Sequence, residues 1–134
     1  MAAEPMIDAI GIVASDLTAS IAFYRRLGLA FPDGDPGEHA EAPIGTTGVR
    51  VMLDSEEMMR GLDPGFEGNP HGRVGLAVRC GSPAEVDKLY ADLAADGFGR
   101  TEPYDAPWGQ RYAHVADPDG QGVDLYAPLP GATA

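Results

Sequence analysis

The sequence is poor in cysteine and histidine and has no long hydrophobic run, and each scarcity excludes a class of protein. A single cysteine, Cys80, cannot close a disulfide within the chain, so a reducing cytoplasm is the expected location. Three histidines and one cysteine show no zinc-ligand spacing. No apolar run approaches membrane-spanning length, and residues 1–6 carry no secretory leader pattern. We therefore expect neither secretion nor contact with a membrane.

Basic residues are also scarce. Nine lysines and arginines stand against 21 acidic residues, which gives a formal net charge of -12 and a pI near 4.3. Such a chain repels nucleic acid and anionic membranes, and it attracts cationic small molecules. The same charge also serves solubility, so it excludes nucleic acid more firmly than it identifies a ligand.

Motifs for covalent chemistry and phosphate binding are missing. Cys80 follows a predicted strand and has no histidine near it in sequence, so no nucleophile and base pair is evident. No glycine-rich phosphate loop is found. These absences favour binding over catalysis.

One pattern, however, occurs twice. A strand over residues 7–13 precedes a helix over 16–28, and a strand over 73–79 precedes a helix over 82–97. Each helix begins at a polar N-cap and ends at a glycine, and Ser82 in the second copy starts a capping box.

Three further strands are predicted after each helix. They cover residues 29–31, 39–44 and 49–54 in the first copy, and 98–104, 110–116 and 121–126 in the second. The chain is therefore a tandem repeat of one β-α-β-β-β module. The boundaries are about 6–54 for module one, 55–70 for a linker, 71–127 for module two and 128–134 for a tail. A module of roughly 60 residues buries little surface alone, so the two should share a core or pair with a second chain.

The last two strands flank a strong turn sequence, Asp-Pro-Asp-Gly at residues 117–120. In the strand that follows, Val123 and Leu125 point to one face, and Asp124 and Tyr126 point to the other. This alternation predicts a strand with one face packed on a helix and one face lining a cavity.

These residues resemble the vicinal-oxygen-chelate superfamily, which includes glyoxalase I, extradiol dioxygenases, fosfomycin-modifying enzymes and bleomycin-resistance proteins. The resemblance rests on Ser15-Asp16-Leu17, Phe23-Tyr24, Leu27-Gly28-Leu29, Asp117-Pro118-Asp119-Gly120 and Val123-Asp124-Leu125. Pro107-Trp108-Gly109 is similar to bleomycin-resistance proteins in particular. The resemblance implies one α+β domain over residues 1–134, in which tandem βαβββ modules form a curved mixed sheet around a central cavity, and it implies a homodimer.

Enzymatic members of the superfamily hold a divalent metal through side chains on the first and last strands of each module. By the resemblance, the four ligand positions fall on Ala9, Met52, Arg73 and Asp124. Alanine has no donor atom, a thioether is too soft, and a guanidinium repels a cation, which leaves Asp124 alone. We therefore expect no metal or other cofactor.

The alternative is a metal-dependent lyase, isomerase or dioxygenase with an atypical ligand set. His71 and Asp54 lie two residues from Arg73 and Met52, hence on the same strand faces, and Asp124 would complete the set.

The leading hypothesis is a metal-free protein that binds a small molecule, similar to antibiotic-sequestering members. The candidate ligand-binding residues are Trp108, Asp124, Arg73, Met52, Tyr104, Tyr112 and His114. The aromatic members are expected to stack on a planar group, and the acidic field around Asp124 should favour a cationic one. Arg73 and Asp124 are expected to form a buried ion pair.

Three structural alternatives stay open. Trp108 could pack in the core beneath the hairpin, and the tyrosines could be ordinary strand residues. His114 could be a structural hydrogen bonder, and His39 is expected at the surface. The chain could instead be an interaction protein, with Met58, Met59 and Leu62 as an apolar patch for a partner.

Overall fold

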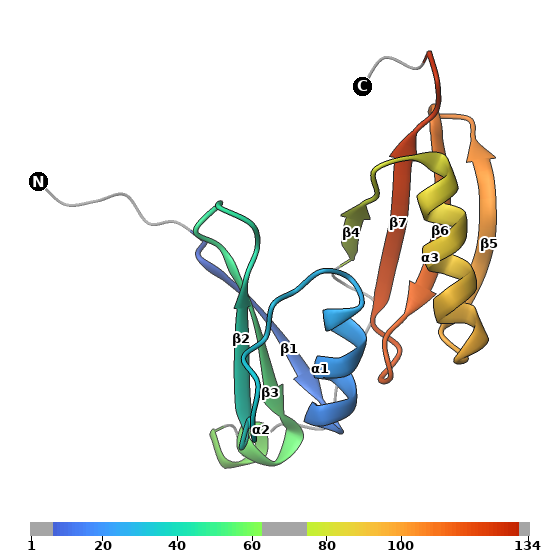
Figure 1. Cartoon of the computed structure of the whole chain (residues 1–134). Coiled ribbons are helices and arrows are strands. Elements are labelled where there is room, and N and C mark those ends of the chain that lie inside the picture. The colour runs from blue at the N-terminus through green and yellow to red at the C-terminus, as the bar shows by residue number, and fades with distance from the viewer. Residues whose placement is uncertain (1–6, 63–74, 132–134) are drawn as a thin grey trace, which may run out of the picture. The chain divides into compact units, whose positions relative to one another are not determined.

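The computed structural model describes residues 7–62 and 75–131, and the chain divides into two compact units, 1–69 and 70–134. Each unit has its own mixed sheet and its own helices (Figure 1). This architecture confirms the α+β prediction. In the described part of the chain, no helix has both the length and the apolar character needed to cross a membrane.

The first unit is a three-stranded sheet with two helices. Its elements are β1 (Ala9–Ala14), α1 (Leu17–Arg25), β2 (His39–Pro43), β3 (Arg50–Ser55) and α2 (Glu56–Leu62). The strand order is β1-β3-β2, with β1 parallel and β2 antiparallel to β3. The buried side chains of α1 and β3 form the core of this unit: Leu17, Ile21, Phe23, Tyr24, Val51 and Leu53.

The first predicted helix is confirmed at both ends. The Asp16 carboxylate accepts a hydrogen bond from the Ala19 N–H at 3.1 Å, which satisfies a donor that the first helical turn leaves free. At the other end Gly28 has a φ of 94°, a left-handed conformation that glycine adopts without a steric penalty.

The strand predicted over residues 29–31 is wrong, so the first unit has the order β-α-β-β before α2. The guanidinium of Arg25 donates to the carbonyl oxygens of Phe31 (3.2 Å) and Pro32 (2.8 Å). These carbonyl groups are therefore bound by a side chain of α1. In a β-sheet they would be bound by the N–H groups of a neighbouring strand. Helix α2 lies at the start of the predicted linker.

The second unit keeps the full β-α-β-β-β order. Its elements are β4 (Leu76–Arg79), α3 (Pro83–Ala95), β5 (Gly99–Ala106), β6 (Gln110–Ala116) and β7 (Gly122–Pro128). The strand order is β4-β7-β6-β5, with β4 parallel to β7 and the other pairs antiparallel. Helix α3 covers one face of this sheet (Figure 1). The predicted N-cap is confirmed, since the Ser82 hydroxyl accepts from the Glu85 N–H at 3.2 Å.

The hairpin between β6 and β7 forms as predicted. The Asp117 carboxylate accepts from the backbone N–H groups of Asp119 and Gln121, both at 2.8 Å. Along β7 the buried residues Val123, Leu125 and Ala127 alternate with half-buried ones. The buried set belongs to the α3 face of the sheet. The face opposite α3 is called the open face below.

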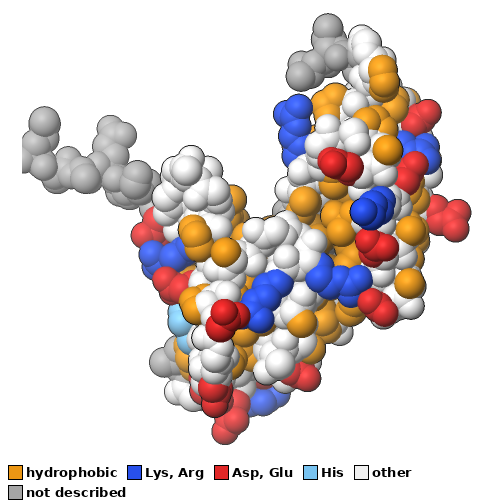
Figure 2. Space-filling view, in the orientation of Figure 1, with side chains coloured by type: hydrophobic (Ala, Val, Ile, Leu, Met, Phe, Trp, Pro, Cys, Tyr) orange, Lys and Arg blue, Asp and Glu red, His pale blue; other side chains and the backbone are white. Residues whose placement is uncertain are grey.

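Acidic side chains are spread over the visible surface of both units and are interspersed with lysine and arginine (Figure 2). In this view the negative charge therefore does not gather into one patch.

Candidate ligand-binding face

Three aromatic side chains meet at one end of the open face in the second unit. Tyr104 on β5 pairs with Tyr112 on β6, and Trp108 lies in the turn that joins these strands. The ring centroids lie 5.3 Å apart for Trp108 and Tyr112, 5.8 Å for the two tyrosines and 6.4 Å for Tyr104 and Trp108. All three pairs are edge-to-face, the arrangement that the ring quadrupoles favour. We call these residues the aromatic cluster.

The aromatic cluster is open to solvent. Trp108 is 56% exposed and Tyr104 is 39% exposed, so the alternative that buries Trp108 beneath the hairpin is wrong. The indole N–H donates to the Gln110 side-chain oxygen at 2.9 Å, which holds the ring beside the strand. Gly109, with a φ of 88°, closes the turn by donating its N–H to the carbonyl of Ala106. Large apolar side chains with a fixed orientation and exposed surface are suited to stacking on a ligand.

A polar network adjoins the cluster through Tyr112. His114 on β6 pairs with Asp124 on β7, and the His114 Nδ1 lies 2.8 Å from the Asp124 carboxylate. Tyr112 also donates to this carboxylate. Burial of the phenol, followed by its hydrogen bond to Asp124, raises the pKa of Tyr112 to about 12. The imidazole of His114 lies against Gly122, where an added Cβ would be 2.9 Å from the ring Cε1.

The predicted site residues are therefore brought together in part. Trp108, Tyr104, Tyr112, His114 and Asp124 share one region of the second unit. The structural role foreseen for His114 is present in its bond to Asp124.

Two of the other predicted positions lie in the first unit. Ala9 and Met52 are half-buried and lie on the same face of their sheet, because Gly11 is the direct partner of Met52 and Ala9 is two residues away from it. Arg73 and His71 lie outside the described residues, so the Arg73–Asp124 ion pair stays a prediction. The same holds for any metal set that includes His71.

The family's divalent metal does not fit the donors that are described. Asp124 is the one hard donor at the described ligand positions, and its carboxylate already accepts from His114 and Tyr112. Asp54, the other candidate donor, is paired with His39 at 2.5 Å. Over residues 7–62 and 75–131, no three His, Cys, Asp or Glu side chains are grouped so that they could hold an ion.

His39 is exposed as predicted, but it has a role that the sequence did not reveal. Its two ring nitrogens lie 2.5 Å from Asp54 and 2.8 Å from Glu41. The hydrogen bond to Asp54, followed by that to Glu41, raises the pKa of His39. The contact between His39 and Glu41 could have been predicted from the sequence, because residues two apart in a strand lie on the same face. The pairing of His39 with Asp54 depends on strand register.

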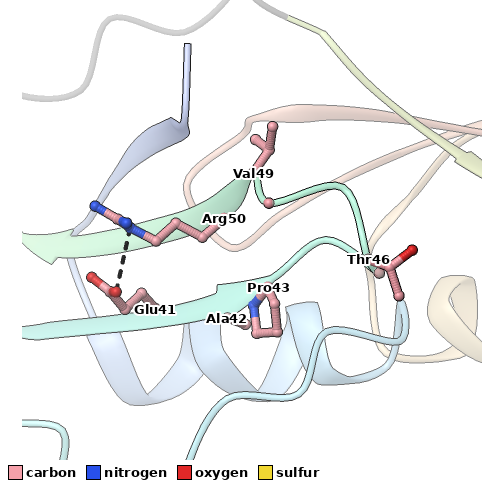
Figure 3. Close-up of a pocket in the computed structure, with 8 residues that line it drawn as sticks. Glu41, Ala42, Pro43, Thr46, Val49 and Arg50 are labelled. Atoms are coloured by element: carbon pink, nitrogen blue, oxygen red, sulfur yellow. Dashed lines mark ion pairs between the residues drawn. The ribbon is translucent and has the colours of Figure 1, made fainter. Parts of the chain in front are cut away.

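Two hollows are lined by described residues of the first unit. One, of about 320 Å³, lies at the turn between β2 and β3, where Glu41 and Arg50 point toward each other with 3.3 Å between carboxylate oxygen and Nε (Figure 3). The other, of about 290 Å³, lies between the acidic loop at residues 32–36 and the start of β2. Neither contains a predicted ligand-binding residue. The first is lined mostly by small apolar and glycine residues of a hairpin end.

Cys80 is half-buried, and burial raises the pKa of its thiol. A raised pKa disfavours the thiolate, the reactive form of cysteine. The absence of a nucleophile motif in the sequence thus agrees with the environment of this residue.

The first unit has the order β-α-β-β before α2 and the second has the order β-α-β-β-β, so the fold defines a class of protein built from two related units, each with its own mixed sheet. The chain belongs to the glyoxalase/bleomycin resistance protein/dioxygenase superfamily, whose family model matches residues 6–125. A solved glyoxalase/bleomycin resistance protein/dioxygenase from Nocardioides is 30% identical, with a TM-score of 0.70 over 99% of this chain and 89% of that one.

Two further solved structures share the fold. A glyoxalase-related enzyme from Fulvimarina pelagi is 24% identical, with a TM-score of 0.75 over 96% of this chain and 95% of that one. A lactoylglutathione lyase from Agrobacterium tumefaciens is 23% identical, with a TM-score of 0.66 over 93% and 95%. A search of curated proteins finds no match.

Proposed function

We propose that this protein binds a small molecule without a metal, and that the ligand stacks on the aromatic cluster at the open face of the second unit. The observation that carries the proposal is the exposure of Trp108 and Tyr104 in a fixed edge-to-face arrangement. Exposed aromatic rings beside a polar network resemble the walls and anchors of a ligand site. Among the possible binding functions, the similarity of Pro107-Trp108-Gly109 to bleomycin-resistance proteins favours sequestration of an antibiotic-like molecule.

Binding is proposed in preference to metal-dependent catalysis because of the donor chemistry. Ala9 and Met52 supply no hard ligand, and the Asp124 carboxylate is bound by its neighbours. The Asp124 network instead holds Tyr112 in place, so the ring that contacts both other members of the cluster cannot rotate freely.

The test uses the fact that Trp108 is the one tryptophan of the chain. Its emission therefore reports on the proposed site alone. Titration with a bleomycin-type glycopeptide, and with 2-naphthamide as a neutral planar probe, should change this emission saturably. One aromatic pair contributes about 0.5–1.5 kcal/mol, so Trp108→Ala should weaken binding up to about tenfold by calorimetry.

Trp108→Phe is the matched control, because it keeps a flat ring and should lose less affinity than Trp108→Ala. Both variants should unfold at the wild-type temperature, since the side chain is exposed. Equal affinity of Trp108→Ala and wild type for every probe that binds would contradict the proposal.

The metal alternative is tested on the same preparation. Chelator-treated protein is titrated with Ni²⁺, Zn²⁺, Mn²⁺ and Fe²⁺, and its unfolding midpoint is followed, because a ligand of the native state raises the midpoint. A saturable rise would refute the metal-free proposal. Light scattering of this sample tests the homodimer that the family resemblance suggests.

A further inference from the structure

Arg79 ends a row of aromatic side chains that crosses all four strands of the second unit. Tyr104 pairs with Tyr112, Tyr112 pairs with Tyr126, and Tyr126 pairs with Arg79. Directly paired residues on neighbouring strands project from the same face of a sheet. The row therefore lies on the open face, with a cation at the β4 end and the aromatic cluster at the β5 end.

Arg79 is exposed, and its guanidinium is absent from the ion pairs found among the described residues. Arg111 of the same unit differs, since it is bound by Asp87 at 2.8 Å and by Asp105 at 3.1 Å. The acidic residue placed diagonally to Arg79 is Asp124, whose strand partner is Ala77. Its carboxylate is bound by His114 and Tyr112 instead.

We infer that the ligand of the aromatic cluster carries an anionic group of the carboxylate class, which pairs with Arg79. This inference rests on the proposed function and adds the chemistry of the ligand. Strands lie about 4.8 Å apart, so Arg79 and Tyr112, which are two strands apart, are separated by roughly 10 Å. An aromatic carboxylate can reach both, with its ring on the cluster and its oxygens on the two-pronged donor set of the guanidinium.

An anionic ligand is the opposite of the cationic ligand that the net charge of -12 suggests. At physiological ionic strength, exposed charges more than about 8 Å apart are largely screened. The net negative charge therefore slows the approach of an anion, but the side chains nearest the ligand determine which ligand charge is bound most tightly. Among the described residues of this face, Arg79 is exposed with no ion pair, whereas the neighbouring Asp124 carboxylate is already hydrogen-bonded.

The experiment compares three probes with the same ring: 2-naphthoate, 2-naphthamide and 2-naphthylmethylammonium. Calorimetry at about 0.15 M salt, where distant charges are screened, should show the carboxylate binding at least fivefold more tightly than the amide. The ammonium should bind most weakly. Arg79→Gln should remove the preference for the carboxylate and leave the affinity for the amide unchanged, and Arg79→Lys should keep part of the preference.

Lys88→Gln is the matched control. It removes one positive charge from α3, which covers the other face of the sheet, and it should leave the order of the three affinities unchanged. Equal binding of the three probes, unaffected by Arg79→Gln, would overturn the inference and leave the proposed function standing. Tighter binding of the ammonium would also overturn it and restore the cationic ligand. Failure of all three probes to bind would refute the proposed function, and the inference with it.

Discussion

Gly122 offers a sharp test of the network that positions Tyr112. A Cβ added at this glycine would lie 2.9 Å from the His114 Cε1 and 3.3 Å from its Nε2. Carbon atoms in good contact lie about 3.5–4.0 Å apart, so in Gly122→Ala the ring must move by roughly 0.6 Å or more. We expect that movement to break the 2.8 Å bond between His114 and Asp124.

The magnitude follows from two opposing effects. A hydrogen bond to a charged group is worth about 1.5–3 kcal/mol, and partial solvent exposure of both partners reduces this to about 1 kcal/mol. Replacement of glycine by alanine, at a position without positive φ, stabilises by about 0.4–1 kcal/mol through the unfolded chain. Gly122→Ala should therefore destabilise only slightly, by about 0–0.6 kcal/mol, in the wild-type background.

The assay is urea unfolding of Gly122→Ala in two backgrounds. With His114→Ala present the ring is gone, so Gly122→Ala should become stabilising, and the two backgrounds should differ by about 1 kcal/mol. Gly11→Ala is the matched control, because Gly11 lies in a strand, has no positive φ and has no atom within 4 Å of an added Cβ. An identical effect of Gly122→Ala in both backgrounds would show that the ring does not lie at Gly122.

Two pH-dependent predictions follow from the shifted groups. The pKa of Tyr112 is about 12, so absorbance titration of Tyr112→Phe should lose the phenol that ionises near that pH. Asp124→Asn should lower the pKa of Tyr112 only in part, because burial is the first cause of the shift. The folded state holds the Tyr112 proton more tightly than the unfolded state, so stability should fall as pH rises from about 10 to 12, and an unchanged midpoint across that window would contradict the shift. For His39, whose pKa is raised above the usual 6.5, the stabilisation is fully present below 6.5 and is lost as pH rises through the raised pKa. Unfolding midpoints measured across that range should fall more in wild type than in His39→Gln, and equal slopes would refute the raised pKa of His39.

Local signals in the sequence predicted most of the elements. The caps at Asp16 and Ser82 depend on hydrogen bonds within three residues, and both form as expected. The alternation in β7 and the turn at residues 117–120 likewise depend on neighbours in sequence. The family followed from these same motifs and is confirmed over residues 6–125.

The strand predicted over residues 29–31 is wrong, and two carbonyl groups in this region are bound by a side chain. Arg25, six and seven residues earlier in the chain, provides donors for the carbonyl groups of Phe31 and Pro32. A prediction from strand propensity does not consider hydrogen bonds from the side chains of other elements. It therefore could not foresee that Arg25 of α1 binds these carbonyl groups.

The chain by itself determined the α+β class, the two similar halves and the identity of the aromatic residues beside the last hairpin. The tertiary structure decided which of these residues meet. Cross-strand register placed Tyr104 beside Tyr112 and His114 beside Asp124, and it joined Asp54 to His39. It also put Arg79 at the end of the tyrosine row. Register is a relation between segments far apart in sequence, and a shift of one residue would send each side chain to the opposite face.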